Sequence, residues 1–266
     1  MILYFVIIVG LNIINIPYDR GANIRGSRKT YNNLRDKLDF LDIESSYIVD
    51  DNADIDKIFN DGSKQISNVI KNNKFPLIIG GDHSISISSV FAINRYYKNI
   101  EKKLGVLWCS AYADFNTPYT SLTGNIHGMP ISILCGHSKP VFSYNNYLYP
   151  EQFGYYGLRD IDSLEFKRLQ DYNMRILYDV DEFREWSQDF DVIHLSFSLD
   201  CLDSGIVSSI NMPLANGLSL IELKNLFVNL REIKKLVSMD FVEYNPEMGD
   251  DSEVVVELLK TLFKNS

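Results

Sequence analysis

The sequence predicts an α/β fold in which helices cover both faces of a parallel sheet. Short apolar runs alternate with longer amphipathic stretches along the 266 residues. The apolar runs are uninterrupted, as expected for strands that are buried on both faces of a parallel sheet. Polar residues gather after five of these runs, where the carboxyl ends of parallel strands form a functional crevice.

The apolar runs and the stretches between them give eight strands and eight helices. Two of the helices carry start signals, because Ser163 precedes Glu165 and an apolar pattern, and Ser219 lies three residues before Glu222 in a capping box. The strands are expected at residues 11–16, 46–49, 77–79, 105–109, 153–157, 174–178, 192–199 and 236–242. The helices are expected at residues 28–41, 55–72, 85–97, 129–135, 163–172, 181–188, 220–230 and 251–263.

The segments outside these elements give no sign of a second domain. The apolar run at residues 1–9 is too short for a membrane span and lacks the flanks of a signal peptide, so we expect a buried strand or an extension of one. Residues 143–149, with Asn145 and Asn146 at their centre, are expected to form a loop. No repeat, low-complexity block or linker divides the sequence, so residues 1–266 are expected to form a single domain.

The composition is that of an ordinary soluble globular protein, with 45% hydrophobic and 23% charged residues. A net charge of -9 and the lack of a basic run argue against nucleic acid or an anionic membrane surface as a partner. The three cysteines, Cys109, Cys135 and Cys201, are far apart, which indicates neither a disulfide framework nor a zinc motif. We therefore expect a reducing, cytoplasmic environment.

Polar clusters follow five of the expected strands. They lie at His83, at residues 110–116, 159–162 and 198–203, and at residues 243–245. Because the carboxyl ends of parallel strands meet at one edge of the sheet, we expect these clusters to converge on a single site. His83, which follows an apolar run and two glycines, is a candidate metal ligand at a strand end.

In order and spacing, these segments resemble the motifs of the arginase and agmatinase (ureohydrolase) family. The likeness runs from about residue 21 to the end of the chain, and the residue sequences of the motifs are closer to those of arginases than to those of agmatinases. It implies a three-layer α/β/α domain with a parallel sheet of about eight strands. The segments are Gly80-Gly-Asp-His-Ser84, Ser110-Ala-Tyr-Ala-Asp-Phe-Asn-Thr-Pro118, Gly124-Asn-Ile-His-Gly128, Gly157-Leu-Arg-Asp-Ile-Asp162, Ser196-Phe-Ser-Leu-Asp-Cys-Leu-Asp203 and Met239-Asp-Phe-Val-Glu-Tyr-Asn-Pro246.

The resemblance implies a site for two manganese ions, which share bridging carboxylates and activate a water molecule for attack on a guanidinium carbon. Ser110 and Ser198 stand where the two bridging carboxylates belong, and Tyr112 stands where a histidine belongs. Neutral hydroxyls replace anions poorly, and a phenol with a reference pKa of about 10 stays protonated at neutral pH. The six ligand positions map onto His83, Ser110, Tyr112, Asp114, Ser198 and Asp200.

Three of the six positions keep residues that can bind a metal. By the resemblance, His83 and Asp114 belong to one ion and Asp200 to the other. These residues are too few for a pair of manganese ions, so we expect a degenerate site and no bound cofactor. The alternative is a single weakly held ion, because three nitrogen or oxygen ligands and water can form an open site. The sequence does not distinguish zinc from manganese in that case.

By the same resemblance, the residues that would hold an amino acid are retained. Asp162 matches the position near the α-ammonium, His127 a proton-shuttling histidine and Glu243 the carboxylate that binds the guanidinium. Such a site would suit arginine or an ornithine-like amino acid, because carboxylates meet its cationic groups and neutral donors meet its carboxylate. Three neutral residues match the positions that bind the α-carboxylate, namely Asn116, Ser121 and Thr123.

The retained segments also have a purely structural interpretation. Residues 116–118 form a turn in this interpretation, and residues 243–246 end a strand, because asparagine and proline are common in turns. His127 would cap the helix that begins near Met129. Met212, which stands where the family usually has a threonine near the substrate, also favours loss of function.

Other residues near the motifs are not expected to complete the metal site. Side chains alternate along a strand, so Cys109 and Cys201 should point away from Ser110 and Asp200 into the core. His194 lies in a strand before the site and is expected to be a hydrogen-bonded core histidine.

We therefore expect an arginase-like protein that is catalytically inactive or impaired, with a structural, regulatory or amino-acid-binding role. The alternative is a metal-dependent arginase that hydrolyses arginine to ornithine and urea with a reduced or single-metal site. Because arginases and agmatinases form oligomers, the resemblance also implies a homo-oligomer, or a hetero-oligomer with an active relative.

Overall fold

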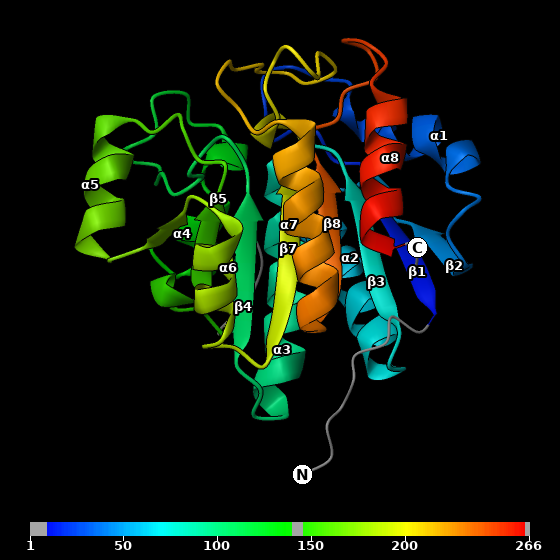
Figure 1. Ribbon diagram of the computed structural model, residues 1–266, viewed down its shortest axis with the longest axis horizontal. Coiled ribbons are helices and arrows are strands. Elements are labelled where there is room, and N and C mark those ends of the chain that lie inside the picture. The colour runs from blue at the N-terminus through cyan, green and yellow to red at the C-terminus, as the bar shows by residue number, and fades with distance from the viewer. Residues whose placement is uncertain (1–9, 140–145, 264–266) are drawn as a thin grey trace.

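The computed structural model describes residues 10–139 and 146–263, so the expected strand at residues 1–9 and part of the expected loop at 143–149 lie outside the described residues. Eight parallel strands form one sheet in the order β2-β1-β3-β8-β7-β4-β5-β6 (Figure 1). All eight strands expected from the sequence are present. They are β1 (Leu11–Ile16), β2 (Ile43–Ile48), β3 (Phe75–Gly80), β4 (Leu104–Cys109), β5 (Phe153–Tyr156), β6 (Arg175–Leu177), β7 (Val192–Ser198) and β8 (Leu236–Val242).

Helices cover both faces of the sheet, which confirms the three-layer α/β/α architecture (Figure 1). Helices α1, α6, α7 and α8 pack on one face, and α2, α3 and α4 pack on the other. The remaining helix, α5, lies beyond the end of the sheet that carries β5 and β6 (Figure 1). The helices are α1 (Thr30–Leu34), α2 (Ile55–Lys71), α3 (Ser86–Asn99), α4 (Pro130–Leu134), α5 (Ser163–Asp171), α6 (Val180–Ser187), α7 (Leu220–Ile233) and α8 (Ser252–Phe263).

Alternation along the central strands divides the buried side chains between two hydrophobic clusters, one on each face. In β7, Ile193, Leu195 and Phe197 belong to the cluster under α7 and α8. The residues between them, His194 and Ser196, point to the face covered by α2 and α3. A polar layer is therefore buried beside α3, directly below the carboxyl ends of β7 and β8.

The first helix is shorter than the sequence predicts. A helix was expected at residues 28–41, but α1 is regular only over Thr30–Leu34 and is flanked by two short 3₁₀ turns, Ser27–Lys29 and Arg35–Lys37. β2 also begins earlier than expected, at Ile43 instead of residue 46.

The two predicted helix starts have different outcomes. Ser219 forms the capping box with Glu222 at the start of α7, as predicted. At α5, however, the cap is Asp162 and not Ser163, because the Asp162 carboxylate accepts hydrogen bonds from the backbone N–H groups of Leu164 and Glu165. An aspartate here stabilises the helix start through both hydrogen bonding and the helix dipole.

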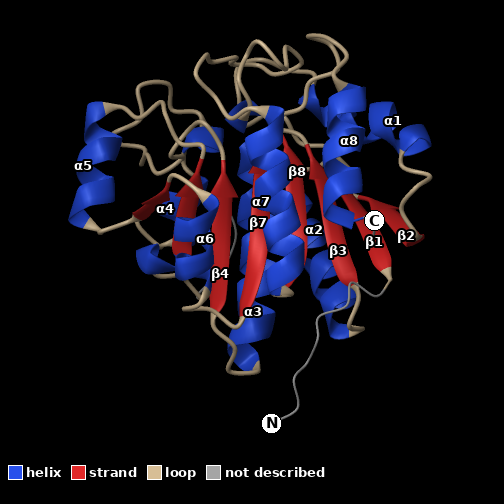
Figure 2. Cartoon of the chain, in the orientation of Figure 1, coloured by secondary structure: helices blue, strands red, loops and turns tan. Residues whose placement is uncertain are grey.

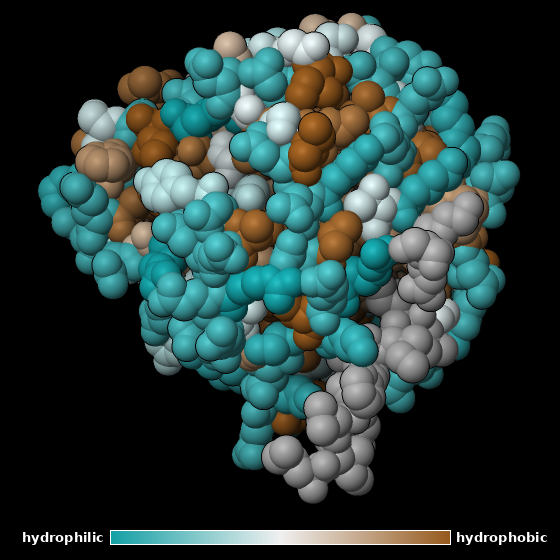
Figure 3. Space-filling view, viewed as in Figure 1, coloured by the Kyte–Doolittle hydropathy of each residue, from teal (hydrophilic) through white to brown (hydrophobic). Residues whose placement is uncertain are grey.

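The loops that follow the strands gather at one edge of the sheet (Figure 2). Five neighbouring strands, β3, β8, β7, β4 and β5, end in the five polar segments singled out from the sequence. The face seen in Figure 3 is largely hydrophilic, with hydrophobic residues grouped near these loops. None of the helices in the described ranges has the length and apolar character that crossing a bilayer requires.

Candidate functional site

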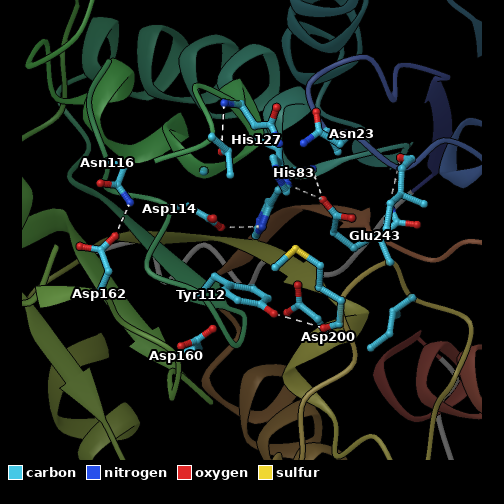
Figure 4. Close-up of a pocket in the computed structure, with 18 of the residues that line it drawn as sticks. Asn23, His83, Tyr112, Asp114, Asn116, His127, Asp160, Asp162, Asp200 and Glu243 are labelled. Atoms are coloured by element: carbon cyan, nitrogen blue, oxygen red, sulfur yellow. Dashed lines mark hydrogen bonds and ion pairs between the residues drawn. The ribbon is translucent and has the colours of Figure 1, made fainter. Parts of the chain in front are cut away.

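A cavity of about 380 Å³ lies at the carboxyl ends of these strands (Figure 4). Two histidines, His83 and His127, line it, and no lysine or arginine of the described residues does so. The cavity is therefore strongly acidic. Its carboxylate residues are Asp114, Asp160, Asp162, Glu165, Asp200 and Glu243.

We call the six positions that resemble metal ligands the floor of the site, and we call Asn116, Ser121, Thr123, Asp162 and Glu165 its wall. All of these residues except Ser110, Ser121 and Ser198 line the cavity itself. The residues of both regions lie at the ends of the strands or in the segments that follow them. One of these segments passes very close to another part of the chain. Gly81, two residues before His83, lies so near the carbonyl of Tyr18 that a Cβ atom would be 1.9 Å from its oxygen. Only glycine fits this approach.

His83 is held on all sides by protein groups. Its Nδ1 lies 2.9 Å from Asp114 Oδ2, and its Nε2 lies 3.0 Å from Ser196 Oγ. Its ring stacks on Trp108 at a centroid distance of 4.0 Å, and Trp108 Nε1 donates a hydrogen bond to the same Asp114 oxygen. Burial opposes a charge on His83, but the Asp114 carboxylate outweighs this effect and raises the pKa of His83. Both ring nitrogens therefore already have partners.

Asp200 is hydrogen bonded to the residue that replaces a bridging carboxylate. Ser110 Oγ donates to Asp200 Oδ1 at 3.0 Å, and the backbone N–H of Ala111 donates to the same oxygen at 2.9 Å. Burial raises the pKa of Asp200. Ser198, the second replacement, is fully buried, and its hydroxyl makes no hydrogen bond within the described residues.

Tyr112 occupies a floor position, but its side chain extends across the cavity (Figure 4). Its hydroxyl donates a hydrogen bond to the carbonyl of Met212 at 3.2 Å. Burial, followed by the nearby Asp200, raises the pKa of Tyr112 above its ordinary value of 10.0. The phenol is therefore neutral at physiological pH, and a neutral phenol is a poor metal ligand.

His127 and Glu243 form an ion pair, with Nδ1 and Oε1 3.6 Å apart. Burial opposes a charge on His127, but Glu243 outweighs it and raises the pKa of His127 to about 9. The same pair lowers the pKa of Glu243 against the effect of burial. His127 does not cap α4, whose cap is Met129, so the structural interpretation of this histidine is wrong.

Two acidic residues of the site have left-handed backbone conformations. The φ angle is +49° at Asp114 and +65° at Glu243. Residues other than glycine adopt such angles rarely, and each costs about 1 kcal/mol or more. Backbone strain of this kind is common at functional sites, where it orients a side chain. Here it occurs at Asp114, which contacts His83, and at Glu243, which contacts His127.

The wall of the cavity is held by hydrogen bonds between its side chains and by others from nearby backbone N–H groups. Asn116 Nδ2 donates to Asp162 Oδ2 at 2.8 Å, while the other oxygen of Asp162 caps α5. The buried Asn116 Oδ1 has no partner within the described residues. Ser121 Oγ accepts from the N–H of Gly124, and Thr123 Oγ1 accepts from the N–H of Asn125. Both hydroxyls can still donate to an anion.

Glu165 is a residue of the site that the sequence analysis treated only as part of a helix start. It is buried, lines the cavity and accepts a hydrogen bond from the N–H of Phe115 at 2.9 Å. Burial and the nearby Asp114 raise the pKa of Glu165 to about 8. Its place in the turn that Asp162 caps was the available signal, because a cap and the third residue after it lie on the same side of a helix start.

The residues of the floor do not fit a pair of manganese ions. Two such ions carry four positive charges and need several anionic oxygens, but Ser110, Ser198 and Tyr112 are neutral. His83 and Asp114 pair with each other. In the described part of the chain, no three histidine, cysteine, aspartate or glutamate side chains form a group arranged to hold a metal ion.

Side chains just outside the cavity behave as the sequence predicts. Cys109 and Cys201 are buried in the hydrophobic cluster on the α7 side, away from the site. His194 is buried and lies 2.8 Å from Ser238 Oγ and 2.9 Å from Asp240 Oδ2. It is therefore a hydrogen-bonded core histidine.

Comparison with known proteins agrees with the fold and the motifs. The arginase family model matches residues 12–264. The arginase of Staphylococcus aureus (strain COL) is 36% identical over 219 residues, which cover 76% of this chain and 71% of that protein. The arginase of Bacillus subtilis (strain 168) is 30% identical over 294 residues, with 95% and 97% covered.

Solved structures show the same relationship. The crystal structure of Entamoeba histolytica arginase in complex with L-ornithine has a TM-score of 0.85 and 25% sequence identity, and the alignment covers 96% of this chain and 99% of that one. The native arginase of Bacillus caldovelox has a TM-score of 0.84 and 26% identity, with 97% and 99% covered. On the evidence of its sequence, its sheet order and these relatives, the chain belongs to the arginase family.

Proposed function

We propose that this protein binds a cationic amino acid, such as arginine or ornithine, and does not hydrolyse it. The observation that carries the proposal is the state of the floor. Its remaining candidate ligands bond to protein groups, His83 to Asp114 and Asp200 to Ser110, while the cavity stays open and acidic. This combination favours binding of an organic cation over binding of two metal ions.

Hydrolysis of a guanidinium needs an activated water molecule, because the carbon under attack is a weak electrophile. In the arginase family the two manganese ions activate the water molecule. The ligand set for these ions is incomplete in this chain. The other candidate base, His127, has a pKa of about 9 and so already carries a proton at neutral pH. A protonated imidazole cannot accept a proton from water.

Binding of an amino acid is supported by the wall. The hydroxyls of Ser121 and Thr123 and the amide of Asn116 would receive the α-carboxylate, and Asp162 would receive the α-ammonium. The carboxylates deeper in the cavity would receive the cationic end of the side chain. A relative with the same fold has been crystallised in complex with L-ornithine, which carries the same three groups.

The proposal is tested by assaying urea release from arginine and measuring the manganese content of the purified protein after dialysis against manganese. We expect no urea above background and no stoichiometric manganese. Metal-dependent release of urea would establish instead the reduced-site arginase. If neither urea nor binding of arginine or ornithine is found, the remaining interpretation is a structural or regulatory role.

A further inference from the structure

The charges of the cavity leave one carboxylate of the floor without a cation. Asp114 pairs with His83, and Glu243 pairs with His127. Asp200 makes no ion pair within the described residues, although it is buried and lines the cavity. Both of its hydrogen bonds, from Ser110 Oγ and from the N–H of Ala111, go to the same oxygen, Oδ1.

A second observation points to a ligand at the same place. Ser198 is fully buried, and its hydroxyl makes no hydrogen bond within the described residues. Alternation along β7 puts Ser198 on the same face as Ser196, which contacts His83, and one step closer to the cavity. Its hydroxyl lies close enough to Asp200 to favour the charged carboxylate. A hydroxyl this close to a carboxylate still offers its own acceptor lone pairs, and a donor from a ligand would satisfy them.

We infer that the cationic end of the bound amino acid takes the place of the metal ions, lying on the floor against Asp200 and Ser198. This inference rests on the proposed function and adds to it the position of the ligand. A guanidinium carries one positive charge and five donor N–H groups, so it needs one carboxylate and several neutral acceptors. Serines at positions 110 and 198 supply neutral acceptors where two metal ions would need carboxylates.

The competing arrangement places the cation against Glu243, which is the position that the family resemblance implies. The two arrangements predict opposite effects for two variants of equal chemistry. Asp200→Asn removes the unpaired carboxylate of the floor, and Glu243→Gln removes the carboxylate that pairs with His127. Because a chelator removes metal ions, any effect of Asp200→Asn in its presence reports on contact with the ligand and not on metal binding.

The test is isothermal titration calorimetry of arginine into the full-length protein with a chelator present throughout. We expect Asp200→Asn to weaken binding at least tenfold and to weaken it more than Glu243→Gln, because a charge-assisted hydrogen bond to the ligand is lost at a buried carboxylate. The exposed Asp189, which follows α6, provides a matched control, and Asp189→Asn should leave binding unchanged.

Ser198→Ala keeps the test decisive if Asp200→Asn does not fold. It removes the hydroxyl and keeps the Asp200 carboxylate, so the ligand-free protein should stay folded, while arginine binding weakens at least threefold. Unchanged binding in Ser198→Ala, or in a folded Asp200→Asn, overturns the inference and leaves the proposed function standing. If wild-type protein binds neither arginine nor ornithine, both are overturned.

Discussion

The floor and the wall of the cavity differ in what holds them together. On the floor, half of the six positions carry neutral side chains, and the candidate ligands that remain bond to protein groups. On the wall, Asn116 and Asp162 bond to each other, and Asp162 also caps α5. None of these wall contacts depends on a metal ion. The comparison teaches that the contacts of the wall are independent of the ligand set of the floor, so one can change without the other.

The largest effect should come from rebuilding the floor. The triple change Ser110→Asp, Tyr112→His and Ser198→Asp restores the ligand set that the family resemblance implies, while the wall stays as it is. We expect two manganese ions to bind and urea release to rise by about 100-fold or more over background, because a two-metal site supplies the activated water. Metal analysis and a urea assay measure both effects.

The matched control for that variant changes the same three positions without adding ligands. Ser110→Ala, Tyr112→Phe and Ser198→Ala together should bind no manganese and release no urea. If the rebuilt floor binds manganese but releases no urea, the wall no longer binds arginine in a productive position, although its hydrogen bonds are intact. If it binds no manganese, the backbone of the floor differs from that of an active arginase.

A smaller but still large effect is expected in the polar layer below the floor. Asp240 is fully buried, and His194 holds its pKa low against the effect of burial. It accepts hydrogen bonds from Ser89 and Ser196, and Ser196 also contacts His83. Asp240→Asn removes a buried carboxylate and leaves the groups that donate to it without their acceptor, so it should lower the free energy of unfolding by about 3–5 kcal/mol.

Urea denaturation with a structural probe measures this loss. The exposed Asp189→Asn should change the free energy of unfolding by less than about 0.5 kcal/mol. If Asp240→Asn costs no more than that control, the layer does not support the floor, and the placement of His83 needs another explanation.

The smallest of the three effects is a pH dependence of stability at the His127–Glu243 pair, which contacts the floor through the backbone N–H of His83. The pKa of His127 is about 9 in the folded protein and about 6.5 when unfolded. A raised histidine pKa stabilises the fold fully below pH 6.5, and this contribution is lost as the pH rises through 9. We expect a loss of about 2–3 kcal/mol across that range.

The variant His127→Asn isolates this contribution. Glu165, whose pKa is raised to about 8, also makes the folded protein less stable as the pH rises, so the wild-type curve contains both effects. The difference between the two proteins in urea denaturation at pH 6.5 and pH 9 reports on His127 and the carboxylates whose pKa it lowers, and leaves out the contribution of Glu165. Equal slopes would show that His127 and Glu243 are not paired in solution.

Sequence was sufficient to predict the eight strands and the segments that meet at the site, because apolar runs and strand-end motifs are local signals. It was not sufficient to predict how side chains from different loops pair. Asp162 was expected near an α-ammonium group, and the structure shows that it also caps α5. Glu165 was not recognised as a residue that lines the cavity. The bond between His83 and Asp114 joins loops after β3 and β4, and its geometry depends on the angle at which both leave the sheet.

The central claim is that this arginase-family protein binds its amino acid without metal ions. The most direct measurement is the affinity for arginine in excess chelator and again in excess manganese, with urea assayed in the same samples. We predict binding in chelator, no gain in affinity with manganese and no urea. Binding that requires manganese, accompanied by release of urea, would contradict the account.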